Sequence, residues 1–465
     1  MAPFIVITVI AVGALIAITM TRGFEGALPF FAFLVILLPL QSRIYFVDLF
    51  VLTTTRAVVV TLVGLYIVHG PQRLKGDPGN ILPLKYLLLL YIGWSIVSTL
   101  NSVVMVTSVK AVIDTVLEFC LVYYIFAKSI SSVQTIHKIL AASIASLVVC
   151  CCFGVIERLT HWKVIDIFPA VIGRLDIPSQ GHLGPGNRIA STFPHPILFG
   201  NALALGIPWA LYLLSSAKNA FLKVVLWVAV IMMSWNIYKT SSRGPWLALV
   251  MSLAVLFVFS KGSIRKYLVI ITVISAATLI LRPGVMDMLR NTYLETRNPD
   301  TPRGASYDYR YELMRGGVHA LARDVGRALW GYGPESFYFL GLEEEASLTG
   351  KIEVLESCDN AWVEIMVETG YVGLLLVAAL LMTAAFLSWK TFRTIPQPAN
   401  FLSLLFLINI CAYAFMMVSV ENFGWGQQTF MLWMVLAMSV VYPRLTRGES
   451  VPKQQLVPSY AGIYR

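Results

Sequence analysis

The chain is dominated by apolar runs that are about as long as a bilayer is thick, and they follow one another from residue 3 to residue 443. About 20 apolar residues in a helix span the hydrocarbon core. Only 13% of the 465 residues are charged, whereas soluble domains carry about 25%. Most side chains must therefore face lipid or one another. This predicts a polytopic integral membrane protein.

A segment that crosses lipid has to satisfy its backbone polar groups internally, which favours helices. We therefore predict an all-α fold, a bundle of about twelve transmembrane helices. The region 26–69 is the least regular, because Pro39, Arg43, Asp48 and Arg56 interrupt it, and we expect one early segment not to cross completely. The candidate segments are 3–20, 26–40, 48–69, 83–100, 112–130, 139–157, 196–214, 221–238, 244–260, 264–281, 361–389, 401–420 and 428–443.

The net charge of +10 sets orientation and does not indicate a nucleic-acid partner, because the basic residues form short clusters between apolar segments. Such clusters mark the cytoplasmic side. They divide the chain into N-terminal transmembrane helices (1–157), a short extracytoplasmic loop (158–195), central transmembrane helices (196–281), an extracytoplasmic catalytic loop (282–360), C-terminal transmembrane helices (361–443) and a cytoplasmic tail (444–465).

The large extracytoplasmic loop, 282–360, holds 22 of the 60 charged residues of the chain. Its segment Tyr309–Trp330 has helical periodicity and ends at a Gly-Tyr-Gly-Pro turn. We expect a partly helical, folded cap. Glu343 to Glu345 are expected to face solvent. The apolar face of the helix is predicted to comprise Leu313, Val318, Leu321, Val325 and Leu329.

Several kinds of site are disfavoured. The six histidines include no pair at the helical spacing of metal ligands, and the chain has neither a phosphate-binding glycine loop nor a dinucleotide fingerprint. Of the six cysteines only Cys358 lies in a polar segment, so neither a disulfide framework nor a catalytic thiol is indicated. We expect no metal and no cofactor.

Three arginines on the extracytoplasmic side, Arg188, Arg243 and Arg310, suit a phosphate ligand, because a guanidinium group binds phosphate in a planar fork. Asp359 or Glu368 suits proton or hydroxyl recognition. The alternative is that these arginines contact lipid headgroups or pair with nearby acids.

Four motifs in a fixed order surround these residues. In this order and spacing they resemble the O-antigen ligase and O-antigen polymerase superfamily of bacterial polysaccharide proteins, over roughly residues 188–440. The motifs are Arg188 with Ser191-Thr192-Phe193 and His195-Pro196, then Thr240-Ser-Ser-Arg243-Gly244, then the helical stretch from Arg310 to Gly333, and finally Asp359-Asn360 with Glu368-Thr-Gly370-Tyr-Val-Gly373.

The resemblance implies an enzyme that transfers a glycan from undecaprenyl pyrophosphate to an acceptor hydroxyl on a glycan, lipid or protein. It implies reaction at the periplasmic face of the bacterial inner membrane, without metal or nucleotide sugar. Asp359 stands where lipopolysaccharide ligases show His, which favours members that make exopolysaccharide or other glycans.

The same resemblance, read with the charges, assigns roles. Arg188 and Arg310 would bind the pyrophosphate, and Asp359 would orient or deprotonate the acceptor hydroxyl. The substrate-binding residues would be Arg243, His195, Asn360 and Glu368.

Two other classes of function stay open at this point. A transporter or flippase for lipid-linked glycans is also polytopic, but it is expected to show repeat symmetry and polar residues at the midplane. A scaffold or sensor would leave the arginines unexplained.

The charge pattern predicts that 158–195 and 282–360 share the extracytoplasmic side. Cysteines introduced as His182→Cys and Glu344→Cys should react with an impermeant maleimide added to intact cells. Ser263→Cys, between Lys261 and Arg265, should not react. Labelling of Ser263→Cys from outside would contradict this topology.

Overall fold

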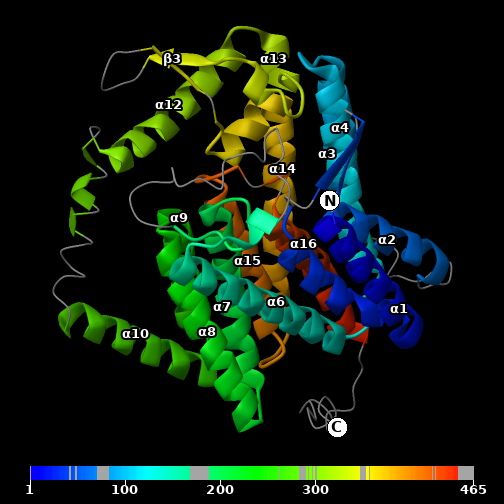
Figure 1. Ribbon diagram of the computed structural model, residues 1–465, viewed down its shortest axis with the longest axis vertical. Coiled ribbons are helices and arrows are strands. Elements are labelled where there is room, and N and C mark those ends of the chain that lie inside the picture. Colours follow the sequence, from blue (N-terminus) through cyan, green and yellow to red (C-terminus); the bar gives the residue numbers. More distant parts are fainter. Residues whose placement is uncertain are drawn as a thin grey trace.

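The computed structural model describes residues 2–40, 43–47, 50–70, 83–167, 188–260, 262–281, 290–291, 293–295, 297–298, 301–345, 352–355, 357–421, 423–424 and 426–448. Parts of both predicted extracytoplasmic loops and of the predicted tail, as well as His182, lie outside these ranges. Figure 1 shows a helical bundle with a smaller region, which carries α12, α13 and β3, at one end of its long axis.

Most of the described helices follow the predicted apolar segments. They are α1 (Ala2–Leu37), α2 (Thr54–His69), α3 (Lys85–Leu100), α4 (Met105–Thr115), the π-helical turn η2 (Val116–Cys120), α5 (Leu121–Ser129), α6 (Val133–Thr160), α7 (Pro196–Ser216), α8 (Ala220–Thr240), α9 (Arg243–Phe259), α10 (Ser263–Leu281), α14 (Ala361–Thr394), α15 (Phe401–Met416) and α16 (Gln427–Gly448).

The remaining elements are one long helix, α12, and several short ones. They are the antiparallel hairpin of β1 (Arg43–Val47) and β2 (Phe50–Thr53), the 3-10 turns η3 (Val164–Ile167) and η4 (Phe337–Phe339), the helices α12 (Pro302–Ala322) and α13 (Val325–Trp330), and the antiparallel hairpin of β3 (Glu343–Glu345) and β4 (Ile352–Val354).

The all-α multi-pass membrane architecture is confirmed. Within the described residues, six helices are long and apolar enough to cross a bilayer: α1, α6, α7, α8, α14 and α16. Four shorter apolar helices, α2, α3, α9 and α15, accompany them. The count of about twelve crossings stays a prediction. The predicted segment 48–69 is helical only from Thr54, because β2 occupies residues 50–53.

The two predicted segments 3–20 and 26–40 lie in one element, α1, that breaks at Gly23. The backbone there has φ 73° and ψ 168°, a conformation that is essentially restricted to glycine. The carboxylate of Glu25, just beyond the break, accepts hydrogen bonds from the Ser131 amide (2.9 Å) and the Thr135 hydroxyl (2.6 Å). The break is therefore held at the turn between α5 and α6.

The charge that obscured the predicted span 48–69 is neutralised inside the bundle. Arg56 of α2 is buried and forms ion pairs with Asp114 (2.8 Å) and Glu118 (2.6 Å). Glu118 projects from the π-helical turn η2. A charge within an apolar segment needs such partners. Arg56 interrupts the apolar pattern of the sequence because its side chain pairs with acids of neighbouring helical elements inside the bundle.

The predicted cap helix is present as α12 and α13, but its buried face differs from the predicted one. Leu313 and Leu321 are buried, whereas Val318, Val325 and Leu329 are exposed. The prediction assumed one continuous helix, and the chain instead restarts at Asp324, which caps α13. The close-packed face of α12 includes Gly316 and Gly317. A Cβ on Gly316 would lie 2.7 Å from Leu355, and a Cβ on Gly317 would lie 2.9 Å from Val363.

The acidic run of β3 was also expected to face solvent, and for Glu344 this is wrong. Its carboxylate is buried and bonds Arg315 and His319 of α12, each at 3.0 Å. A carboxylate that bonds an arginine and a second side chain is buried at lower cost than an unpaired one, and local sequence does not show that β3 packs on α12. Val325→Cys, at a side chain 78% exposed, is therefore a better topology reporter than Glu344→Cys.

The cap is joined to the bundle where two glycine backbones meet. Helix α14 breaks at Gly370 (φ 70°, ψ −177°), and Gly331, after α13, has φ 74°. A Cβ on Gly370 would collide with the carbonyl of Leu329, and one on Gly331 would collide with the carbonyl of Glu368. Gly331 and Gly370 therefore allow the two backbones to approach each other closely.

Three carbonyls just before the break accept hydrogen bonds from outside the helix. The Val367 carbonyl accepts from the amide of Tyr332 (3.0 Å), and the Glu368 carbonyl accepts from the amide of Gly333 (2.8 Å) and the Ser98 hydroxyl (2.8 Å). The Thr369 carbonyl accepts from the indole of Trp94 (2.9 Å). Helix α3 and the cap thus replace the intrahelical bonds that α14 loses.

We predict that Gly370→Ala lowers the stability of the protein by on the order of 3 kcal/mol, because it combines backbone strain with a backbone collision. The matched control is Gly93→Ala in α3, where a Cβ meets nothing within 4 Å. It should change stability by less than about 1 kcal/mol. Thermal unfolding in detergent measures both. Equal midpoints for the two variants would contradict the proposed joint.

Candidate active site

Arg188 is fixed by the turn between α8 and α9. Its Nε donates to the carbonyl of Thr240 (2.8 Å), and an Nη donates to the hydroxyl of Ser242 (2.8 Å). The carbonyl of Thr240 is free to accept because α8 ends there. Ser242 is the N-cap residue of α9, and Arg243 is the first residue of that helix.

Three helix N-termini lie in this part of the molecule. His195 caps α7 by accepting a hydrogen bond on Nδ1 from the Ile197 amide (3.1 Å). Asn360 caps α14 by accepting from the amides of Trp362 (3.0 Å) and Val363 (3.3 Å). The third is the N-terminus of α9. Helix N-termini carry partial positive charge and favour anions.

The start of α9 contacts α7 and the turn that follows α15. A Cβ on Gly244 would lie 2.5 Å from the Ser419 hydroxyl, and a Cβ on Gly200 of α7 would lie 2.7 Å from Pro245. The turn after α15, in turn, holds α14, because the Ala361 amide donates to the Met417 carbonyl (2.8 Å). The beginnings of α7 and α9 therefore pack on each other, and the residues that follow α15 connect α9 with α14.

Arg310 of α12 brings the cap to this place. One Nη contacts the carboxylate of Asp359 (3.2 Å) and the carbonyl of Ser419 (3.2 Å). The guanidinium group thus lies between the backbone that follows the C-terminus of α15 and the carboxylate next to the N-cap of α14. A cation near the C-terminus of α15 and an anion near the N-terminus of α14 are each favoured by the dipole of the helix. The side chains of Arg310 and Asp359 are 22% and 39% exposed, so the pair is accessible.

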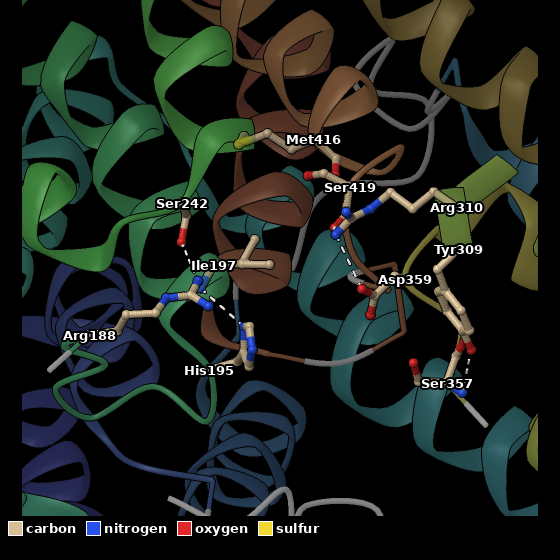
Figure 2. A network of polar contacts seen from close by, with 10 residues as sticks. All are labelled: Arg188, His195, Ile197, Ser242, Tyr309, Arg310, Ser357, Asp359, Met416 and Ser419. Carbon is tan, nitrogen blue, oxygen red and sulfur yellow. Dashed lines mark hydrogen bonds and ion pairs between the residues drawn. The ribbon is translucent and has the colours of Figure 1, made fainter. Parts of the chain in front are cut away.

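A second contact from α12 holds the same loop. The hydroxyl of Tyr309 donates to the carbonyl of Ser357 (2.8 Å) and accepts from its amide (3.0 Å). Figure 2 shows the guanidinium groups of Arg188 and Arg310 directed toward the region of the Asp359 carboxylate, with His195 and Ser242 beside Arg188.

The electrostatics of the site reflect its burial. Burial raises the pKa of the Asp359 carboxyl, although Arg310 and Arg188 act to lower it. Burial and the nearby Arg310 lower the pKa of Arg188. Burial and the two guanidinium groups lower the pKa of His195 to about 3. His195 is therefore neutral, and because Nδ1 accepts a hydrogen bond, Nε2 carries its proton.

The structure thus brings together the predicted catalytic residues Arg188, Arg310 and Asp359. His195 and Asn360, predicted to bind substrate, are helix caps at this site. Glu368 lies elsewhere on α14, about 10 Å along the helix from Ala361 at 1.5 Å per residue. Its Oε1 accepts from the Phe337 amide of the cap (3.4 Å).

Sequence reasoning missed three participants. Tyr309 carried one usable signal, its position beside Arg310. Ser242 carried another, its place in the Thr240-Ser-Ser-Arg243-Gly244 motif. Ser419 carried none, since it acts through its backbone carbonyl. Within the part of the chain that the structure describes, no three His, Cys, Asp or Glu side chains gather as a metal site would require.

The cap geometry predicts how Asn360 behaves when it is changed. Asn360→Ala should lower stability by about 1 kcal/mol, because two amides lose their acceptor, whereas Asn360→Ser keeps a capping oxygen and should retain most of it. Thermal unfolding and glycan transfer are measured on both variants. If Asn360→Ser keeps full stability but loses transfer, the amide contacts substrate and its role is not limited to capping.

Part of the chain is similar to a known protein family. A family model described as O-antigen ligase matches residues 228–378, a range that includes Arg243, Arg310 and Asp359. No curated protein sequence matches the chain. The match supports, at family level, a membrane glycosyltransferase of the O-antigen ligase or polymerase kind, and it gives no support to a flippase. The predicted resemblance is confirmed over this range: residues 228–378 are similar to the O-antigen ligase family.

Proposed function

We propose that this protein transfers a glycan from undecaprenyl pyrophosphate to an acceptor hydroxyl in the synthesis of a cell-surface polysaccharide, without metal or nucleotide sugar. The reaction would take place at the periplasmic face of the bacterial inner membrane. The observation that carries the proposal is that Arg188 and Arg310 flank Asp359 near three helix N-termini.

The charge of this arrangement suits a pyrophosphate group. Two guanidinium groups exceed the single carboxylate between them by one positive charge, and the helix N-termini add partial positive charge. Arginine can bind two phosphate oxygens at once. In a partly dehydrated site such groups stabilise the negative charge that develops as pyrophosphate leaves. Arg243, at the start of α9, would add to this field.

Asp359 suits the acceptor side of the reaction. Its pKa is raised by burial, which makes the carboxylate a better proton acceptor than an ordinary aspartate. The acceptor oxygen would attack the anomeric carbon, and its proton would pass to Asp359. The bond from that carbon to the pyrophosphate oxygen would break, and undecaprenyl pyrophosphate would leave as the anion.

The other predicted substrate-binding residues receive different roles. His195 and Asn360 would keep the ends of α7 and α14 in position beside the substrate. We assign Glu368 to the joint between α14 and the cap, because its carboxylate meets the Phe337 amide there.

The test separates pyrophosphate binding by Arg310 from a purely structural ion pair with Asp359. Arg310→Lys keeps the charge but loses the planar fork, and Arg310→Ala loses both. If Arg310 binds pyrophosphate, transfer should fall on the order of a hundredfold or more in Arg310→Ala and should remain strongly reduced in Arg310→Lys, with little change in thermal stability.

The matched control is Arg315→Ala, on the same helix, which breaks the cap pair with Glu344 (3.0 Å). It should affect stability and leave the rate per folded molecule unchanged. Transfer is measured with undecaprenyl-pyrophosphate-linked glycan on purified protein. Full transfer by Arg310→Lys, or a loss that only follows the melting temperature, would remove Arg310 from the site.

A further inference from the structure

The loop that carries Asp359 is attached to its surroundings at several points. Ser357 is bonded through both backbone groups to the Tyr309 hydroxyl, donating at 3.0 Å and accepting at 2.8 Å. Cys358 is buried in the apolar cluster that joins the cap to α14. Asn360 caps α14. Asp359 itself, between these attachments, contacts Arg310.

The contact with Arg310 is the one attachment that the proposed reaction would break. If Arg310 turns to a pyrophosphate, it can no longer bond Asp359 in the same geometry, and the carboxylate loses its ionic partner when it must meet the acceptor hydroxyl. A base has to lie within hydrogen-bond reach of the proton it takes, and misplacement by about 1 Å costs up to a hundredfold in rate. Another contact has to hold the loop during the reaction.

The Tyr309 contact meets this requirement because it is neutral and bonds only backbone groups. An anionic ligand that draws Arg310 away does not compete for the Ser357 amide and carbonyl. Tyr309 directly precedes Arg310 on α12, so both residues move with the same helix. The ring of Tyr309 also packs on the apolar cluster of the cap, which limits the motion of its hydroxyl.

We propose that Tyr309 is a positioning residue for Asp359: its hydroxyl holds the backbone at Ser357, so that the carboxylate stays in place while Arg310 exchanges Asp359 for the phosphate of the donor. The catalytic consequence rests on the proposed function. The structural part, that the hydroxyl immobilises residues 357–359, does not.

Tyr309→Phe tests both parts, since it removes the hydroxyl and keeps the ring. Hydrogen exchange by mass spectrometry should show faster exchange in peptides that cover Ser357 and Asp359, at an unchanged melting temperature. With undecaprenyl-pyrophosphate-linked glycan, kcat should fall on the order of tenfold or more. The KM for the donor should change little, because Arg188 and Arg310 are retained.

The pH profile provides a readout that a general loss of stability would not move. Burial raises the pKa of Asp359, while Arg310 of α12 and Arg188 of the segment before α7 oppose this effect. A loosened loop admits water, so the pKa of Asp359 should fall toward its ordinary value in Tyr309→Phe. Activity should then be lost at a lower pH on the acid side than in the unaltered protein.

The matched control is Tyr311→Phe, the same chemical change on the same helix at a side chain that is 51% exposed. It should leave exchange, kcat and pH profile unchanged. Unchanged exchange at Ser357 in Tyr309→Phe would overturn the proposal. The proposal would also be overturned if Tyr309→Phe and Tyr311→Phe had the same kcat while Arg310→Ala abolished transfer, because the proposed function would then hold without a role for Tyr309. If Tyr309→Phe exchanges faster at Ser357 but the unaltered protein transfers no glycan, the positioning role of Tyr309 stands and the proposed function is rejected.

Discussion

A backbone amide or carbonyl inside a bilayer has no water to bond, and this constraint decides both where the chain is helical and where polar groups are available for other work. Helix interiors use their own hydrogen bonds. Helix ends leave unpaired amides at one terminus and unpaired carbonyls at the other. The candidate site consists largely of such ends: the N-termini of α7, α9 and α14, the last carbonyl of α8 and the turn that follows α15.

Side chains of opposite charge match these ends. Arg188 donates a hydrogen bond to the carbonyl of Thr240, and Arg310 donates one to the carbonyl of Ser419. Asp359 directly precedes the N-cap residue of α14. The arginines therefore satisfy carbonyls in the structure and also have the chemistry to bind phosphate. A partly exposed ion pair contributes little to stability, so the exchange of Asp359 for an anionic ligand would cost the fold little.

The cap owes its position to a second break in a helix. Gly370 interrupts α14, and the carbonyls released there are bonded by α3 and by the segment after α13. Arg310 and Tyr309 belong to α12, which packs on the first part of α14. The contact between two glycine backbones thus determines where α12 lies, and with it the position of the guanidinium group above Asp359.

The sequence by itself determined the membrane-spanning helical architecture, the presence of a helical cap, and the residue types of the site, because hydropathy, helical period and charge are local properties. Charge made Arg188, Arg243, Arg310 and either Asp359 or Glu368 candidates, and the family resemblance then assigned the catalytic roles to Arg188, Arg310 and Asp359. The tertiary structure alone decided that Glu344 is buried against Arg315 and His319, that Glu368 faces the cap, and that Tyr309 bonds Ser357. These contacts join segments that are distant in the sequence or bond backbone groups, and neither the spacing of residues nor their chemical type encodes which segments meet.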